Sequence, residues 1–170
     1  MARSVHISLV GESDLIRKLN GLGDRVYRNV VASASRKSFK AVLDHAQSLV
    51  PTETGLLKSS LGVKQKKYPQ SGRIVTVIGP RKGYGANVVV NLSGQRISQF
   101  RDPVKYAHLV EFGASPHTIT AGGTTYTHPG APAQPFMRPA YDANESKTVS
   151  GMKAYLSIGV EREARKAGKK

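Results

Sequence analysis

The stretch GVKQKKYPQSGRIVTVIG, residues 62–79, predicts a β-hairpin near the middle of the chain. Two strand-like arms, 62–68 and 73–79, flank the four residues PQSG, which are typical of turns. The second arm contains the run IVTVI, rich in the β-branched residues that strands favour. We therefore expect a small antiparallel sheet organised around this hairpin.

Helical patterns lie on both sides of the hairpin. Residues 24–50 repeat apolar side chains at steps of three and four, which places them on one face of a long helix that Pro51 ends. A last helix is expected from Phe136 towards Lys166, with apolar residues on one face. The helix stripes comprise Tyr27, Val30, Val31, Ala34, Val42, Ala46 and Leu49 in the first helix and Met137, Ala140, Val149, Met152, Leu156 and Val160 in the last. Two glycines, Gly151 and Gly159, weaken the last helix by ~1 kcal/mol each relative to alanine.

Shorter elements complete the pattern. Residues 5–10 alternate as a half-buried strand, residues 13–22 predict a short helix, and residues 86–92 predict a third strand in the middle of the chain. Thr54 is expected to cap a single helical turn. Asp102 and Pro103 predict the start of a helix that Gly113 ends in the left-handed conformation, although alternation over residues 106–112 leaves a strand as the alternative.

These elements predict an α+β fold. We expect a small antiparallel sheet, made of the hairpin plus one or two further strands, packed against a long N-terminal and a long C-terminal helix, with extended loops. A length of 170 residues suits a single domain spanning 1–170. Residues 114–134 lack periodicity and are expected to form a mobile loop that a neighbour orders, and residues 163–170 a flexible basic tail.

The chain carries a formal charge of +15, from 26 Lys and Arg against 11 Asp and Glu. Such a charge favours nucleic acid, acidic protein surfaces or lipid headgroups, although solvated faces and a frayed basic end account for it equally well. No stacking platform or sequence-reading motif accompanies the cations, so any DNA contact is expected to lack sequence readout. Candidate electrostatic contacts are Lys64, Lys66, Lys67, Arg81 and Lys82.

The sequence contains no complete catalytic motif. Cysteine is absent, and GxSxG, P-loop and HExxH patterns are missing, while the SxxK match at Ser150–Lys153 lacks its companion motifs. His108 and Glu111 have a metal-ligand spacing that His117 and His128 could extend, but metal sites need three or four converging ligands. We expect no enzyme activity, no cofactor and no metal. The chain also lacks a signal-peptide core and any run approaching ~18 apolar residues, so no membrane association is expected.

Three segments together resemble a known family. The segments are PTETGLLKSSL (51–61), YAHLVEFG (106–113) and HPGAPAQPFMRPAYDAN (128–144). They occur in the same order in the gene product ten family of lambdoid phages, which the chain therefore resembles and whose members are minor tail and head–tail joining proteins of long-tailed bacteriophages. The resemblance covers roughly residues 10–165, and its third segment is the most specific. Longer stretches between Gly79 and Pro103 and after Gly113 depart from the family pattern. The motif residues are Gly55, Leu56, Leu57, Tyr106, Glu111, Phe112, Gly113, Gln134, Pro135, Phe136, Arg138 and Pro139.

The resemblance implies a structural virion protein of the phage neck, made in the host cytoplasm. It implies a tail-completion or head–tail joining subunit in a homo-oligomeric ring of sixfold or twelvefold symmetry. Its partners would be head connector and portal-associated proteins, tail tube or terminator proteins, and passing DNA without sequence preference. A tail terminator and a basic non-specific nucleic-acid-binding protein are the alternatives.

The motif residues also carry structural expectations of their own. Phe136 and Met137 are expected to anchor the last helix in the core with Arg138 exposed, although PAQPFMRPA can equally be only a well-formed helix start. Phe112 is expected in the core beside Val110, and Glu111 is expected to pair with a cation.

Overall fold

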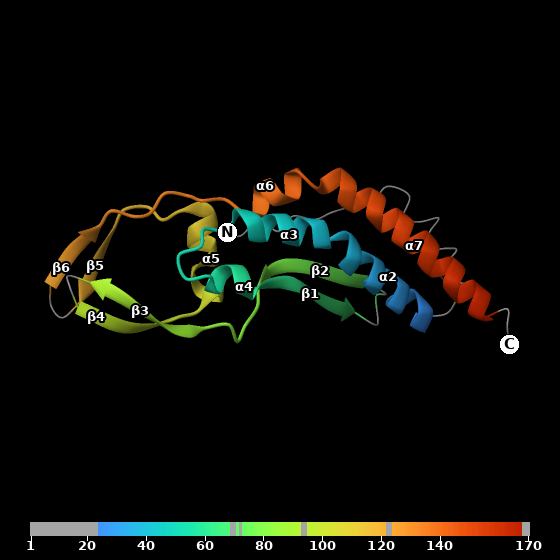
Figure 1. Cartoon of the computed structure of the whole chain (residues 1–170), viewed down its shortest axis with the longest axis horizontal. Helices are drawn as coiled ribbons and strands as arrows, with labels where there is room; N and C mark the ends of the chain where they lie inside the picture. The colour runs from blue at the N-terminus through green and yellow to red at the C-terminus, as the bar shows by residue number, and fades with distance from the viewer. Residues whose placement is uncertain (1–23, 69–70, 72, 93–94, 122–123, 168–170) are drawn as a thin grey trace. The chain divides into compact units, whose positions relative to one another are not determined.

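The computed structural model describes residues 24–68, 71, 73–92, 95–121 and 124–167. The predicted strand at 5–10 and helix at 13–22 lie outside these residues. The helices are α2 (Asp24–Ser38), α3 (Lys40–Leu49), α4 (Leu56–Ser60), α5 (Pro103–Phe112), α6 (Met137–Asp142) and α7 (Glu145–Ala167) (Figure 1). The strands are β1 (Leu61–Tyr68), β2 (Arg73–Pro80), β3 (Ala86–Leu92), β4 (Gln95–Arg101), β5 (His117–Ala121) and β6 (Thr124–His128).

The fold is α+β, as the sequence predicts. Within the described residues the strands form two-stranded sheets, β1–β2, β3–β4 and β5–β6, so the further strands build hairpins of their own. The chain divides into two compact units. Unit 1 comprises Met1–Phe39, Gln65–Thr76 and Ser146–Lys170, and unit 2 comprises Lys40–Lys64 and Val77–Glu145. The β1–β2 hairpin contributes residues to both units.

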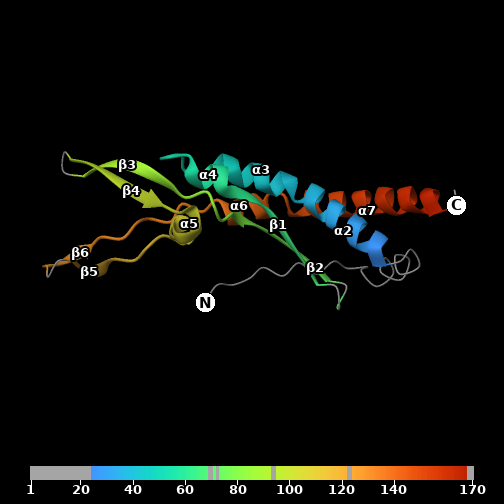
Figure 2. The same cartoon turned by 90° about the horizontal axis from the view of Figure 1, so that it is seen from below.

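Unit 1 is built on two antiparallel helices, α2 and α7, which run side by side (Figure 2). Val30, Ala34 and Leu156 form its buried cluster, and Val31, Met152 and Val160 pack against it. Because these residues belong to the two predicted apolar stripes, the helix periodicity is confirmed here. Burial of the stripes removes apolar surface from water, which favours the folded state by roughly 25 cal/mol per Å².

Polar side chains attach the β1–β2 hairpin to α2. Gln65 donates from Nε2 to the carbonyl oxygen of Ala32 at 2.7 Å, and the Ser35 hydroxyl hydrogen-bonds the hydroxyl of Thr76. Gln65 and Thr76 therefore face α2. Side chains alternate along a strand, so their direct neighbours Lys66 on β1 and Val75 on β2 belong to the opposite face.

A glycine allows α2 and α7 to approach closely. A Cβ atom at Gly159 would lie 2.5 Å from Cγ1 of Val30, closer than side-chain atoms pack. Gly151 occupies the same helix, yet its nearest neighbour would be Cβ of Ser38 at 3.7 Å, an ordinary contact. From the sequence, both glycines are expected to weaken the helix by the same amount. Of the two positions, the structure requires glycine only at 159.

Two helices that the sequence predicts as continuous are interrupted. The predicted helix over 24–50 divides at Phe39 into α2 and α3, although it ends before Pro51 as expected. The last helix divides at Ala143 and Asn144 into α6 and α7. Asn144 donates from Nδ2 to the carbonyl oxygen of Ala140 at 2.9 Å, and asparagine side chains that bond nearby backbone compete with helix formation.

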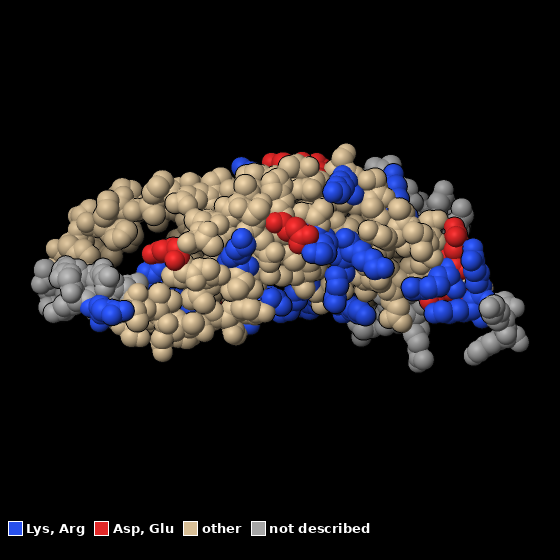
Figure 3. Space-filling model, viewed as in Figure 1, with Lys and Arg blue, Asp and Glu red and all other residues tan. Residues whose placement is uncertain are grey.

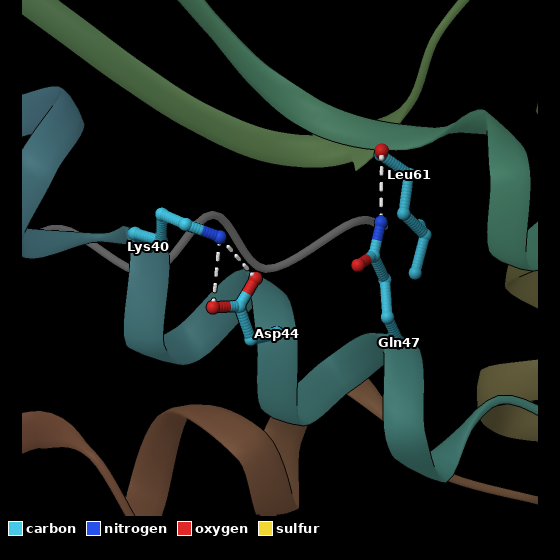
Figure 4. Close-up of polar contacts among 4 residues, drawn as sticks. All are labelled: Lys40, Asp44, Gln47 and Leu61. Atoms are coloured by element: carbon cyan, nitrogen blue, oxygen red, sulfur yellow. Dashed lines mark hydrogen bonds and ion pairs between the residues drawn. The ribbon is translucent and has the colours of Figure 1, made fainter.

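Unit 2 buries residues from α3, α4, α5 and α6. Its buried apolar side chains include Val42, Ala46, Val50, Leu57, Leu61, Ala107, Phe136 and Ala140. Gln47 on α3 donates from Nε2 to the Leu61 carbonyl oxygen at 3.5 Å, which ties the helix to the start of β1 (Figure 4). Lys40 and Asp44 form an exposed ion pair at 2.7 Å on the same helix, an arrangement that contributes only a few tenths of a kcal/mol.

Residues 114–134 contain a β-hairpin. From the sequence, a loop is expected here because these residues lack apolar periodicity. β5 and β6 pair antiparallel from His117 opposite His128 to Ala121 opposite Thr124. Threonine alternates with Ile119 on β5 and with Tyr126 on β6. Threonine, isoleucine and tyrosine all favour strands. Ordering of this segment by a neighbour stays a prediction.

The two glycines of α7 provide a matched test of close helix packing. Gly159→Ala should lower the free energy of unfolding by about 1–3 kcal/mol, because overpacking against Val30 exceeds the gain in helix propensity. Gly151→Ala should raise it by up to ~1 kcal/mol, because the new methyl group finds room. Urea denaturation of both variants decides the matter, and equal effects at the two positions would show that α2 and α7 do not pack this closely.

Candidate assembly site

The three segments that carry the family resemblance meet in unit 2. α4 packs against α5, and the chain after β6 returns alongside the end of α5. Gln134 donates its backbone N–H to the carbonyl oxygen of Val110 at 2.8 Å. Ala114 and Ala131 exchange two backbone hydrogen bonds of 2.9 Å. Segments that are far apart in the sequence are therefore joined through their backbones.

Glu111 holds the start of α6. Its Oε2 accepts the backbone N–H groups of Phe136 at 2.8 Å and Met137 at 2.9 Å, and its Oε1 accepts that of Arg138 at 3.0 Å. The first N–H groups of a helix lack partners within the helix, and Phe136 at the N-cap has no polar side chain to supply one. The buried carboxylate takes this role, in place of the cation that the sequence analysis expected beside it.

Gly113 turns the chain away from α5 towards the backbone pairing with Ala131. Its φ of 75° favours glycine, and a Cβ atom there would lie 2.7 Å from the carbonyl oxygen of Ala131. The predicted positive φ is confirmed, but ψ is 178°, outside the left-handed helical region. The predicted cap at the other end of α5 is confirmed as well, because the Asp102 side chain accepts the N–H of Val104 at 3.1 Å.

A groove of about 410 Å³ lies among the three segments. Arg101 and Glu53 form an ion pair at its edge, with Nη1 and Oε2 3.2 Å apart. Burial raises the pKa of Tyr106, and the nearby Arg101 and a hydrogen bond with Thr54 partly oppose this rise. The groove is lined by Pro51, Glu53, Thr54, Gly55 and Leu57, by Arg101, Tyr106, Leu109 and Val110, and by Ala131, Pro132 and Gln134.

The remaining motif residues divide between the core and the surface. Phe136 is buried, Met137, Pro139 and Leu56 are half-buried, and Gln134, Pro135 and Arg138 are exposed. Phe112 was expected in the core, and this expectation is wrong, because its side chain is 73% exposed. On α5, Phe112 directly follows Glu111, which is buried, and adjacent residues of a helix point in different directions.

The candidate basic residues have different roles. Lys64, Lys66, Lys67 and Lys82 are exposed. Arg81 is engaged in the fold: its Nε donates to the Ser60 carbonyl oxygen at 3.2 Å, and its guanidinium lies over the ring of Tyr84 at 4.5 Å.

The sequence analysis did not single out Tyr68 and Arg73 as a pair. Arg73 lies over the ring of Tyr68, with 4.9 Å between its Cζ and the ring centroid. The signal was available, because the turn PQSG separates these two positions and a hairpin brings them together.

The histidines do not form the larger ligand set that their spacing suggested. His117 and His128 stack across the β5–β6 hairpin with ring centroids 5.0 Å apart. His108 is exposed, whereas Glu111 is buried with both oxygens bonded to backbone amides. Over the described residues, no group of three or more His, Cys, Asp or Glu side chains is placed to hold a metal ion. The described helices also include none with the length and apolar character to span a bilayer.

A family model matches residues 13–113, a range that includes the first two motif segments. The family is described as "Bacteriophage HK97-gp10, putative tail-component". The chain belongs to this HK97-gp10-like family. Membership makes it a structural, tail-related component of a bacteriophage virion, where it interacts with other virion proteins. No curated protein and no solved structure matches the chain.

The Glu111 cap predicts a large loss of stability on its removal. Glu111→Ala should lower the free energy of unfolding by roughly 3–5 kcal/mol, because three backbone N–H groups lose a charged acceptor in a buried position. Glu111→Gln keeps one acceptor oxygen and should lose about half as much. Guanidinium denaturation of the three proteins measures both values, and a loss below ~1 kcal/mol for Glu111→Ala would contradict the capping role.

Burial of Phe136 predicts a second large effect. Its side chain is 1% exposed, so Phe136→Ala should lower the free energy of unfolding by about 3–5 kcal/mol through lost burial and a cavity. The exposed neighbour Arg138 supplies the control, since Arg138→Ala retains the backbone N–H that Glu111 binds. A loss below ~1 kcal/mol for Phe136→Ala in chemical denaturation would mean that the ring contributes little to the core.

Proposed function

We propose that the protein is a tail-completion or head–tail joining subunit that forms a ring in the phage neck, between head connector and tail. The observation that carries this proposal is a set of large apolar side chains exposed in unit 2. Val89 and Phe100 on the β3–β4 hairpin are 56% and 64% exposed, Tyr126 on β6 is 50% exposed, and Phe112 at the end of α5 is 73% exposed. Val89 and Phe100 share one face of the β3–β4 hairpin, because Val89 pairs with Ser98 and Asn87 pairs with Phe100, and neighbouring exposed apolar side chains favour contact with other proteins.

The hairpins themselves support assembly. β3 and β4 pair over seven positions, from Ala86 opposite Arg101 to Leu92 opposite Gln95, and β5 and β6 form another two-stranded sheet. A two-stranded hairpin is marginally stable by itself, and its unpaired edges can accept further strands. Neighbouring subunits would stabilise both hairpins by covering their apolar side chains.

A ring is the closed form of such an assembly. Unit 2 combines a groove with hairpins that carry exposed apolar side chains, which are different surfaces of one unit. Contact between different surfaces of identical subunits is head-to-tail, and it closes into a ring when the rotation between subunits permits. The proposed neighbours above and below this ring are head connector and tail tube or terminator proteins.

A non-enzymatic role is part of the proposal. The ionisable groups of the groove are already matched, since Glu53 pairs with Arg101. A tail terminator would need similar ring contacts and is the second candidate.

The position of the subunit in the particle tests the proposal. Cryo-electron microscopy of virions that carry a tagged copy should place the tag in a ring between the head connector and the tail. If the tagged ring is found on tails that lack heads, at the end that would join the head, the protein is a tail terminator instead. Label at the distal tip of the tail would contradict both roles.

Phe112→Ser provides the matching mutational test. This change should alter the free energy of unfolding by less than about 1 kcal/mol, because the side chain is exposed, yet it should strongly reduce the yield of joined heads and tails. Ile158→Ser on α7 is the control, since Ile158 is 61% exposed and lies in unit 1. Equal yields for Phe112→Ser and wild type would remove Phe112 from the assembly surface.

A further inference from the structure

Unit 1 has a strong excess of cations. The acidic residues among its described side chains are Glu161 and Glu163 near the end of α7, where Glu163 pairs with Arg162 and Lys166 at 3.2 and 3.0 Å. Figure 3 shows Lys and Arg side chains gathered around α2 and at the C-terminal end of α7. The cations of unit 1 with described side chains are Arg36, Lys37, Lys66, Lys67, Arg73, Lys147, Lys153, Arg162, Arg165 and Lys166.

The β1–β2 hairpin concentrates part of this charge around one aromatic ring. Lys66 Nζ lies 5.0 Å and Arg73 Cζ 4.9 Å from the ring centroid of Tyr68. Both cations are exposed, and among the described residues neither forms an ion pair with an acidic side chain. We name Lys66, Tyr68 and Arg73 the cationic cluster.

The cluster lies on the face of the hairpin that points away from α2. Gln65 and Thr76 face the helix through their hydrogen bonds, and alternation places Lys66 and Tyr68 on the opposite face of β1 and Arg73 on that of β2. Lys67 shares the strand face of Gln65. Two like charges therefore lie against the Tyr68 ring on one strand face, where cation–π attraction offsets part of their mutual repulsion.

We propose that the cationic cluster binds the phosphate backbone of double-stranded DNA. Charge complementarity carries the inference: in a chain of charge +15, the strand face away from α2 presents cations that have no acidic partner among the described residues, and phosphates are the anions that Lys and Arg neutralise on DNA. The proposal rests on the neck position only for the source of the DNA, which passes through that ring. Binding by the free subunit does not depend on the ring.

Composition favours DNA over an acidic protein as the occupant. Interfaces between proteins have an apolar centre and are depleted in lysine. The large exposed apolar side chains described in unit 1, Tyr155 and Ile158, belong to α7. On the hairpin face of the cluster, β1 presents Lys64 and Lys66, and β2 exposes Val77 beside Arg73. One aromatic side chain is too few to stack a series of bases, so contact with the backbone fits better than single-strand binding.

The salt dependence of binding tests the proposal. Affinity of the full chain for a duplex of about 30 base pairs is measured by fluorescence anisotropy over a series of salt concentrations. The double variant Lys66→Gln/Arg73→Gln should make the slope of log affinity against log salt shallower by about 2, because each lost phosphate contact removes about 0.9. The control Lys58→Gln/Lys105→Gln removes the same charge from exposed positions of unit 2 and should change the slope by less than about 1.

Tyr68 provides an independent readout. Tyr68→Phe keeps the ring and should retain the wild-type affinity, whereas Tyr68→Ser should weaken DNA binding severalfold because the two cations lose their shared support. Circular dichroism and chemical denaturation establish that each variant is folded.

Four outcomes overturn the proposal. They are an absence of DNA binding at low salt, equal slopes for the double variant and its control, equal affinities for Tyr68→Ser and wild type, and competition by poly-glutamate as effective as that by duplex of equal charge. The last result would indicate an acidic protein partner. Failure of any kind here leaves the neck position intact, because microscopy of the virion tests that position separately.

Discussion

The carboxylate of Glu111 joins two segments whose contact organises the rest of unit 2. It lies on the inner face of α5 and accepts three backbone N–H groups at the start of α6. Phe136, whose N–H is one of the three, is itself buried, so the same contact that satisfies the helix start also places an aromatic ring in the core. Charged acceptors form stronger hydrogen bonds than neutral ones, and leaving these amides unpaired in a buried position would be costly.

This cap joins the second and third of the three segments that meet in unit 2. YAHLVEFG supplies the carboxylate and the glycine that turns the chain, and PAQPFMRPA supplies a helix start that has no capping side chain of its own. The backbone pairing of Ala114 with Ala131 and of Gln134 with Val110 encloses the same region. α4 completes the groove. Removal of the Glu111 carboxylate would leave the backbone N–H groups of Phe136, Met137 and Arg138 without their acceptor.

The surface proposed for protein contact and the surface proposed for DNA contact belong to different parts of the chain. In unit 2, Val89, Phe100 and Tyr126 on the hairpins and Phe112 at the end of α5 are exposed, and Glu53 pairs with Arg101 beside the groove. In unit 1, α2 and α7 pack closely at Gly159, and the strand face away from α2 carries lysine, tyrosine and arginine. The first surface suits contact with protein subunits, and the second suits an anionic polymer. The two proposals therefore assign subunit contact and DNA contact to surfaces of different chemistry.

Local patterns in the sequence determined the β1–β2 hairpin, the apolar stripes of α2 and α7, the end of α3 before Pro51, and the Asp102 cap of α5. Each depends on residues within a few positions of one another, and the structure confirms them. The tertiary structure alone decided the partner of Glu111, the exposure of Phe112 and the requirement for glycine at 159. Those depend on atoms brought together from distant parts of the chain, which no local periodicity encodes. Glu111 illustrates the difference, because a carboxylate within VEFG predicts an interaction with a donor, and only the folded chain brings three backbone amides to it.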